Sequence, residues 1–155
     1  MRAFILAAGM GTRISKNIQQ MHKSLLPLRS GEPLLHYTVT NFLDLGIEPV
    51  VITGYKQQSI HEALKNLPVK FFHNPFYKIT NSLASLWFAK EYIGQECIIM
   101  DGDLFFEPKF FDILKNNNEQ SKVFIDPSKN ENEMDYCLEL DNKNKIITYG
   151  KNITC

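Results

Sequence analysis

The sequence predicts an α/β protein, a three-layer sandwich with a mostly parallel sheet and a late β-hairpin. Over the first 125 residues, short apolar runs of strand type alternate with stretches of helical character. This alternation is typical of βαβ units, which build parallel sheets covered by helices. After residue 126 the pattern changes to two alternating segments around a polar turn, which indicates an antiparallel hairpin.

Five apolar runs are predicted as strands of the main sheet, and two later segments as the hairpin. The runs are Ala3–Ala8, Pro49–Thr53, Val69–Phe72, Glu96–Met100 and Lys122–Ile125. The hairpin consists of Tyr136–Leu140 and Lys145–Tyr149, joined by Asp141–Asn144.

Four stretches between these runs are predicted as helices. They are Pro33–Leu45, a short helix opened by Ser59, the segment Asn81–Ile93, and Pro108–Leu114. Gly46 follows the first helix, as glycine often follows a helix end. Ser59 and Glu62 have the spacing of a capping box. Leu83, Leu86 and Trp87 recur at helical spacing in the third helix.

Composition limits the class of protein. The 155 residues, 44% of them hydrophobic, suit one globular domain over 1–155. A formal net charge of +0 gives no general attraction to nucleic acid or to an anionic membrane, so neither is an expected partner. An anion-binding site must therefore be built locally.

The cysteines and the N-terminus favour a cytoplasmic protein. Cys97, Cys137 and Cys155 are odd in number and lack C-x-x-C spacing, which argues against a disulfide framework or a zinc site. The first apolar run is too short for a secretion signal or a membrane span.

The segment from Leu6 to Arg13 directly follows the first predicted strand. Its small residues would let the backbone approach a ligand, so that successive N–H groups hold phosphate oxygens or a base edge. Arg13 and Lys23 add positive charge suited to phosphate. The candidate nucleotide-binding residues here are Leu6, Ala7, Ala8, Gly9, Gly11, Thr12, Arg13 and Lys23.

Two better-known glycine motifs do not fit this segment. The dinucleotide fingerprint requires a third glycine or alanine where this chain has Ile14, and a P-loop requires glycine before Lys23-Ser24. From the residues alone, Gly9 and Gly11 are better explained by a tight turn after a strand.

A second candidate site follows the fourth predicted strand. Asp101 and Asp103 form a D-x-D at its carboxyl end, where parallel sheets place their ligands. Carboxylate oxygens are ligands that Mg²⁺ prefers, and the metal could bridge them to phosphates. The alternative is a structural one, in which Asp103 caps the helix that follows.

A third candidate is the polar segment that opens the helix at Asn81. Thr80, Asn81, Ser82 and Ser85 could fix a base or a phosphate there. An ordinary helix cap explains the same residues, and the residues alone favour it.

The ordered pattern L-A-A-G-x-G-T-R, followed by K-S-L-L-P, resembles the signature of the sugar-phosphate and phosphocholine nucleotidyltransferase superfamily. The resemblance implies a Rossmann-like sheet and a backbone contact to the base from Leu6 to Gly9. It also implies that Gly11 to Arg13 wrap the phosphates, that Lys23 neutralises them, and that Asp103, with Asp101, holds Mg²⁺. Arg13, Lys23 and Asp103 are then the catalytic residues. One position departs: the residue before the lysine is usually proline, and His22 is expected to leave Lys23 less rigid.

The segment N-P-x-Y-x-x-T-N-x-x-x-S-L from Asn74 to Leu86 resembles the cytidylyltransferase-like branch of that superfamily. This resemblance implies transfer of CMP from CTP to a small phosphorylated or phosphonate acceptor such as phosphocholine, with release of pyrophosphate. A sugar-1-phosphate nucleotidyltransferase is the alternative enzyme. Because family members run longer, the domain is expected to be truncated at its C-terminal end, and a non-catalytic nucleotide-binding or assembly module is the alternative of another class. A homodimer is left open.

Overall fold

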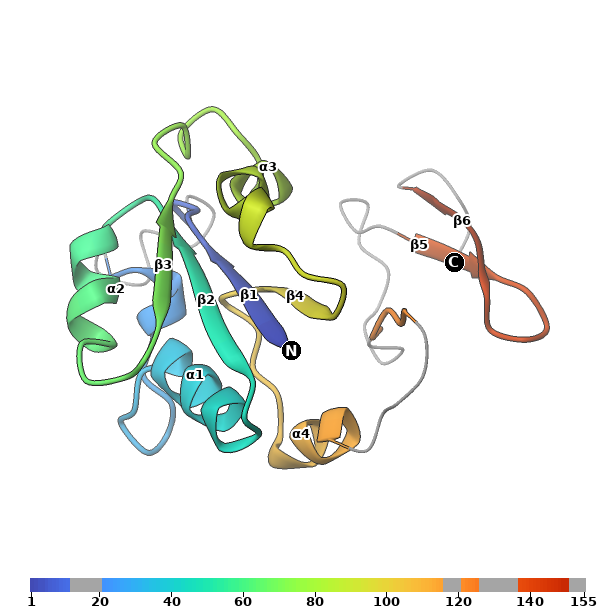
Figure 1. The fold of residues 1–155 in the computed structure, drawn as a ribbon, viewed down its shortest axis with the longest axis horizontal. Coiled ribbons are helices and arrows are strands. Elements are labelled where there is room, and N and C mark those ends of the chain that lie inside the picture. Colours follow the sequence, from blue (N-terminus) through green and yellow to red (C-terminus); the bar gives the residue numbers. More distant parts are fainter. Residues whose placement is uncertain (12–20, 116–120, 126–136, 151–155) are drawn as a thin grey trace. The chain divides into compact units, whose positions relative to one another are not determined.

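The computed structural model describes residues 1–11, 21–115, 121–125 and 137–150 (Figure 1). The chain divides into two compact units, Met1–Asn117 and Asn118–Cys155, and each is described by itself.

The first unit is built on a parallel sheet with the strand order β3-β2-β1-β4. The strands are β1 (Arg2–Ala7), β2 (Glu48–Thr53), β3 (Lys70–His73) and β4 (Cys97–Asp101). β1 lies at the centre, where Leu6 is in register with Ile52 of β2 and with Asp101 of β4. The first four predicted strands are confirmed, each shifted by about one residue.

The helices of this unit lie between the strands in sequence. They are the 3-10 turn η1 (Lys23–Leu25), α1 (Leu34–Asp44), α2 (Gln57–Ala63), α3 (Ser82–Leu86), the 3-10 helix η2 (Trp87–Tyr92) and α4 (Pro108–Lys115). The alternation of strand and helix predicted from the sequence is therefore the observed one.

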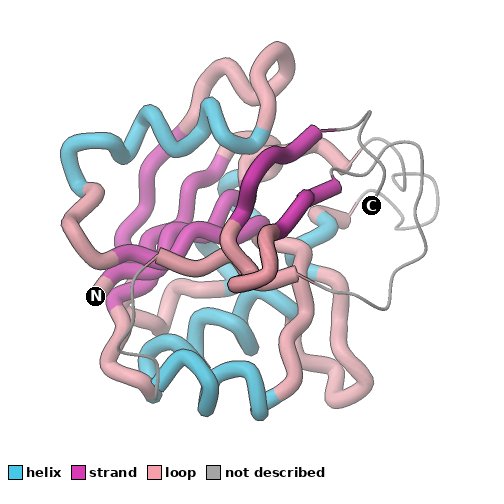
Figure 2. Tube along the Cα trace, turned by 90° about the vertical axis from the view of Figure 1, so that its right-hand side faces the viewer, coloured by secondary structure: helices cyan, strands magenta, loops and turns pink. Residues whose placement is uncertain are grey.

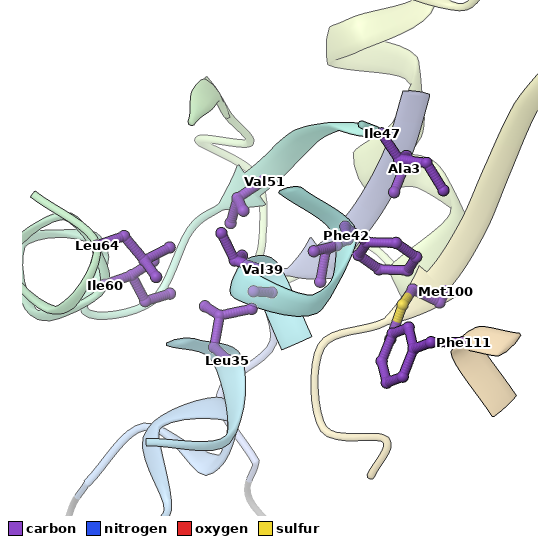
Figure 3. Packing of buried hydrophobic residues seen from close by; sticks show 12 residues of the cluster. Ala3, Leu35, Val39, Phe42, Ile47, Val51, Ile60, Leu64, Met100 and Phe111 are labelled. Atoms are coloured by element: carbon purple, nitrogen blue, oxygen red, sulfur yellow. The ribbon is translucent and has the colours of Figure 1, made fainter. Parts of the chain in front are cut away.

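Both faces of the sheet are covered, which makes three layers (Figure 2). Successive side chains of a strand point to opposite faces, and in β1 Ile5 belongs to one core cluster while Phe4 belongs to the other. The larger cluster contains Val39 and Phe42 of α1 and extends to α2 and to Phe111 of α4 (Figure 3). On the other face the smaller cluster is closed by Ala89 of η2.

Two helices differ in detail from the prediction. α2 begins at Gln57, with Lys56 as its N-cap in the left-handed region at φ 48°, so Ser59 and Glu62 lie inside the helix rather than opening it. The third predicted helix is α3 continued by η2, and Leu83 and Trp87 are each 66% exposed. Its buried positions are Ser85 and Ala89, and of the three predicted apolar residues only Leu86 packs against a core cluster.

The second unit contains the antiparallel hairpin β5 (Cys137–Leu140) and β6 (Ile146–Gly150), as predicted. The Asp141 carboxylate accepts hydrogen bonds from the backbone N–H groups of Lys143 and Lys145, which fixes the turn. The predicted strand Lys122–Ile125 is wrong, since this run has no regular structure and its apolar side chains are exposed.

One cysteine also differs from expectation. Cys137 is disulfide-bonded, whereas Cys97 is free. Within the described residues, none of the helices has the length and apolar character needed to cross a membrane.

Candidate active site

The strand order places the two main sequence motifs side by side. The chain runs from β1 outward to β2 and β3, then returns to the other side of β1 as β4. Ligands of parallel sheets bind at such a switch point, beyond the carboxyl ends of the strands. Here the Gly102 N–H donates to the Leu6 carbonyl oxygen at 2.9 Å, so the acidic loop begins directly beside the glycine-rich segment.

The glycines at these strand ends are required for different reasons. A Cβ on Gly102 would lie 3.0 Å from Ser24 Oγ and 3.2 Å from the Leu6 carbonyl oxygen, so close packing excludes a side chain. Gly11 has φ +61°, which favours glycine. A Cβ on Gly9 would meet nothing within 4 Å. Packing within the described residues therefore does not explain Gly9.

Lys23 and Asp103 form an ion pair across this switch point. Lys23 Nζ lies 2.6 Å from Asp103 Oδ2, and the two side chains are 26% and 34% exposed. The aliphatic part of Lys23 passes close to Gly11, because a Cβ added to Gly11 would lie 3.5 Å from Lys23 Cδ. The cation expected for phosphate and a carboxylate expected for metal thus contact each other.

Asp101 is the second carboxylate of the cluster. Partial desolvation and then the negative charge of Asp103 raise its pKa, while the charge of Lys23 and a hydrogen bond from Ser82 oppose the increase. Two carboxylates that repel each other near a single lysine favour the arrival of another cation.

Ser82 is one of the four polar residues predicted to fix a base or a phosphate, but its contact with Asp101 was not predicted. Nothing in the local sequence distinguishes Ser82 from Thr80, Asn81 and Ser85. Its contact with Asp101 follows from the position of α3 beside the end of β1, a tertiary arrangement.

The donor set fits Mg²⁺. Asp101 and Asp103 supply hard oxygen atoms, and Mg²⁺ is usually held by one or two carboxylates together with substrate phosphates. Within the parts of the chain that the structure describes, no cluster of three or more His, Cys, Asp or Glu side chains could hold a metal by itself. A metal held by Asp101 and Asp103 would therefore need oxygen ligands besides those that the described residues supply.

The turn that carries Lys23 is buried on both sides of the lysine and is capped by a side chain. His22 and Ser24, on either side of the lysine, are 1% and 0% exposed. His22 Nδ1 accepts a hydrogen bond from the Ser24 N–H at 3.2 Å and caps η1. Whether His22 leaves Lys23 less rigid than proline would stays a prediction, but the turn before Lys23 has a side-chain cap that proline could not provide.

The polar segment after β3 is organised around Asn74, which is fully buried. Asn74 Nδ2 donates to Thr80 Oγ1 at 2.9 Å and to Ser85 Oγ at 3.0 Å, while its Oδ1 accepts from the Phe76 N–H at 2.8 Å. Asn81 accepts from the Ala84 N–H and caps α3. Sequence reasoning assigned no role to Asn74, although an N-P pair is a recognised turn signal.

The predicted nucleotide-binding residues fall into three groups. Leu6, Ala7 and Ala8 are buried, so their backbone is the part available to a ligand. Gly9, Gly11, Lys23, Asp101 and Asp103 surround the switch point. Thr80, Asn81 and Ser85 belong to the Asn74 segment, and Thr12 and Arg13 lie outside the described residues.

A parallel sheet with a glycine-rich loop, a lysine and paired carboxylates at its switch point has the parts of a nucleotide-binding α/β domain. The chain belongs to the family of the MobA-like NTP transferase domain, whose model matches residues 3–138. Its fold is that of the nucleotidyltransferases: it resembles the inositol-1-phosphate CTP transferase from T. maritima with a TM-score of 0.72 at 22% identity, over 98% of this chain and 64% of that one.

Several relatives transfer CMP according to their names. The chain is 30% identical to a CMP-5'-(3-aminopropyl)phosphonate synthase of Streptomyces rubellomurinus over 79% of this chain and 20% of the relative. It is 30% identical to a choline-phosphate cytidylyltransferase of Haemophilus influenzae over 84% of this chain and 56% of the relative. The structure of the CTP:phosphocholine cytidylyltransferase from Streptococcus pneumoniae matches with a TM-score of 0.60 at 28% identity, covering 66% of this chain and 44% of that chain. This chain therefore spans only part of the length of these relatives.

Proposed function

We propose that this protein is a Mg²⁺-dependent cytidylyltransferase that moves CMP from CTP to a small phosphorylated or phosphonate acceptor such as phosphocholine. The observation that carries the proposal is the cluster of Lys23, Asp101 and Asp103 beside the open backbone of Gly9. It combines a cation for phosphate, oxygen ligands for a metal and a surface that a nucleotide can approach.

In the proposed reaction, an oxygen of the acceptor phosphate or phosphonate attacks the α-phosphorus of CTP. A new P–O bond forms, the bond between the α-phosphorus and the α,β-bridging oxygen breaks, and pyrophosphate leaves with the bonding electrons. No covalent intermediate with the protein is needed, so the residues act by positioning and by neutralising charge.

Each residue of the site has a distinct task in this reaction. Lys23 neutralises phosphate oxygens, and the backbone from Leu6 to Gly11 holds the nucleotide, with Thr12 and Arg13 proposed to extend that contact. Asp101 and Asp103 would hold Mg²⁺, which when bound screens the charge of the phosphates. When the nucleotide arrives, Lys23 exchanges its contact with Asp103 for phosphate.

The choice of CTP and of a small acceptor is supported by the relatives named for phosphonate and choline-phosphate substrates. Thr80, Asn81 and Ser85 are proposed to border the nucleotide, from a segment that Asn74 fixes close to the end of β2. A Cβ on Gly54 at that end would lie 2.7 Å from Tyr77 Cβ, which shows how closely the segment packs there.

Calorimetric titration with CTP, UTP, GTP and ATP in the presence of Mg²⁺ tests the donor. We expect CTP to bind most tightly. Release of pyrophosphate is then measured with phosphocholine, 2-aminoethylphosphonate and glucose-1-phosphate as acceptors. Nucleotide binding without turnover on any acceptor would favour a non-catalytic binding module, and the absence of binding to all four nucleotides would refute both readings.

A sugar-1-phosphate nucleotidyltransferase is the second candidate, because relatives of that kind also match. A UTP–glucose-1-phosphate uridylyltransferase of Haloferax volcanii is 28% identical over 77% of this chain and 50% of the relative. Turnover of UTP with glucose-1-phosphate, and not of CTP with phosphocholine, would select this enzyme.

Lys23→Ala and Asp103→Ala are each expected to abolish measurable turnover, because each removes a charge that the reaction requires. Both side chains are partly exposed, so circular dichroism should show an intact fold. Lys65→Ala is a matched control, since Lys65 pairs with Glu62 on the exposed surface of the same unit. Wild-type turnover in either site variant would contradict the assignment.

A further inference from the structure

We infer that His22 is a positioning residue that holds Lys23 toward the phosphate site through the hydrogen bond from the Ser24 N–H to its Nδ1. The inference rests on the proposed function of Lys23. It assigns a role to a buried histidine that contacts no substrate and whose neighbour in sequence is the cation of the site.

Two hydrogen bonds from the same residue define the turn that carries Lys23. The His22 carbonyl oxygen accepts from the Leu25 N–H at 2.8 Å, and His22 Nδ1 accepts from the Ser24 N–H at 3.2 Å. A side chain that caps a turn in this way satisfies a backbone donor that otherwise lacks a partner. Lys23 is enclosed between the two bonds, so the direction of its backbone is fixed by His22.

The same turn is seated against the acidic loop. Ser24 is fully buried, and its Oγ lies 3.0 Å from the position that a Cβ on Gly102 would take. Gly102 separates Asp101 from Asp103, so the residue after Lys23 packs on the residue between the two carboxylates. This packing sets the distance across which Lys23 Nζ reaches Asp103 Oδ2.

The hydrogen bond also fixes the chemical form of the imidazole. Because Nδ1 accepts a hydrogen bond from the Ser24 N–H, the ring is neutral and carries its proton on Nε2. Burial, followed by the charge of Lys23, lowers the pKa of His22 and favours this neutral form. Nε2 is buried without a hydrogen-bond partner among the described residues, although the backbone of Gly9 and of Ala7 interacts favourably with the ring. The ring thus lies between the glycine-rich segment and the lysine turn.

The backbone of His22 suggests a second way to make a rigid turn. Its φ of −69° and ψ of 132° are values that proline adopts readily. His22→Pro would restrict the turn through its ring, whereas His22→Asn would keep a side-chain acceptor close to the position of Nδ1. His22→Ala keeps neither.

The first experiment measures the position of Lys23 without nucleotide. Wild type, His22→Ala and His22→Asn are labelled with a trace of acetic anhydride, and mass spectrometry gives the acetylation of each lysine relative to Lys65 of the same chain. We expect Lys23 to become about fivefold more reactive in His22→Ala, because a lost cap frees the ion pair, and to stay near wild type in His22→Asn. Equal reactivity of Lys23 in all three proteins would overturn the inference.

The second experiment is a double-mutant cycle on CTP binding in the presence of Mg²⁺. His22→Ala should weaken binding about fivefold when Lys23 is present and not at all in the Lys23→Ala background, because His22 acts through Lys23. His22→Asn and His22→Pro should restore most of the loss. A purely structural role predicts the same loss in both backgrounds, and that result would overturn the inference.

The two experiments separate the two proposals. If wild type binds no nucleoside triphosphate, the proposed function fails, while the acetylation experiment still decides whether His22 holds Lys23. Suppose instead that wild type binds CTP and that Lys23→Ala weakens that binding. If His22→Ala then weakens CTP binding equally with Lys23 present and in the Lys23→Ala background, the proposed function stands and the role of His22 is refuted.

Discussion

Lys23 and Asp103 neutralise each other as an ion pair. An ion pair that is about one-third exposed is stabilised only modestly, because water screens both charges. A triphosphate with its metal offers each partner a stronger contact, phosphate for the ammonium and a divalent cation for the carboxylate. Under the proposed function, these stronger contacts would replace the ion pair.

Lys23→Met is expected to raise the affinity for Mn²⁺ without nucleotide by about fivefold, since an exposed ion pair contributes at most about 1 kcal/mol. Removing the lysine leaves Asp101 and Asp103 to repel each other with no cation between them. Electron paramagnetic resonance of free Mn²⁺ measures the change. Lys65→Met is the control, because it removes a lysine from an ion pair remote from the carboxylates. Unchanged or weaker Mn²⁺ binding in Lys23→Met would show that the pair does not compete with the metal.

The strand ends determine which glycines serve packing and which serve a ligand. A Cβ on Gly54 would lie 2.8 Å from the Ala8 carbonyl oxygen and 2.9 Å from Ala8 Cβ, and neither atom belongs to a flexible side chain. The Cβ of an alanine at position 9 would point into open space. Packing thus requires glycine at position 54, whereas packing among the described residues does not require it at position 9.

Gly54→Ala is expected to lower the free energy of unfolding by about 1–3 kcal/mol, because the added methyl group overpacks the junction. Gly9→Ala is expected to change stability by less than about 0.5 kcal/mol, yet to weaken CTP binding by at least about tenfold where phosphate must approach the backbone. Urea unfolding and calorimetry measure the two quantities. Normal CTP binding by Gly9→Ala would remove this residue from the proposed site.

Asn74 plays a comparable structural role for the segment between β3 and α3. Asn74→Ala is expected to lower the free energy of unfolding by about 2–4 kcal/mol, because the buried Ser85 hydroxyl and the Phe76 N–H lose their partner. Asn81→Ala, which removes the exposed cap of α3, should cost only about 1 kcal/mol. Urea unfolding compares the two, and equal losses would mean that Asn74 does not organise the segment.

At the scale of the whole molecule, the parallel sheet was predictable because each strand is a short apolar run between polar residues. The site was predictable where a motif is continuous, as from Leu6 to Gly11. It was not predictable where it depends on tertiary packing. The contact of Ser82 with Asp101 requires α3 to lie near the end of β1, and the burial of Ser85 instead of Leu83 depends on which side of the helix faces the sheet. The exposed run Val123–Ile125 shows that apolar residues alone do not make a strand without a neighbouring strand to pair with.

The free energy of unfolding should depend on pH because His22 is buried. Burial, with the charge of Lys23, lowers the pKa of His22 below its ordinary value of 6.5, while the backbone of Gly9 and Ala7 and the charge of Asp103 act in the opposite direction. Among the described residues, the Tyr55 ring also lies near His22, with 6.3 Å between the two ring centroids. Above pH 6.5 the histidine is neutral in both the folded and the unfolded chain and contributes no pH dependence.

Below pH 6.5 the unfolded chain takes up a proton at this histidine more readily than the folded chain does, so the free energy of unfolding falls as the pH falls. The slope from one such group is at most about 1.4 kcal/mol per pH unit. Urea unfolding of wild type and His22→Asn at pH 7.5, 6.5 and 5.5 (about one unit apart, to span this transition) measures it. The other histidines and the carboxylates are common to both proteins, so their contribution cancels in the difference. We expect wild type to lose more stability than His22→Asn between the two lower pH values and about the same amount between the two higher ones. Parallel profiles throughout would show that His22 takes up its proton equally well in the folded chain.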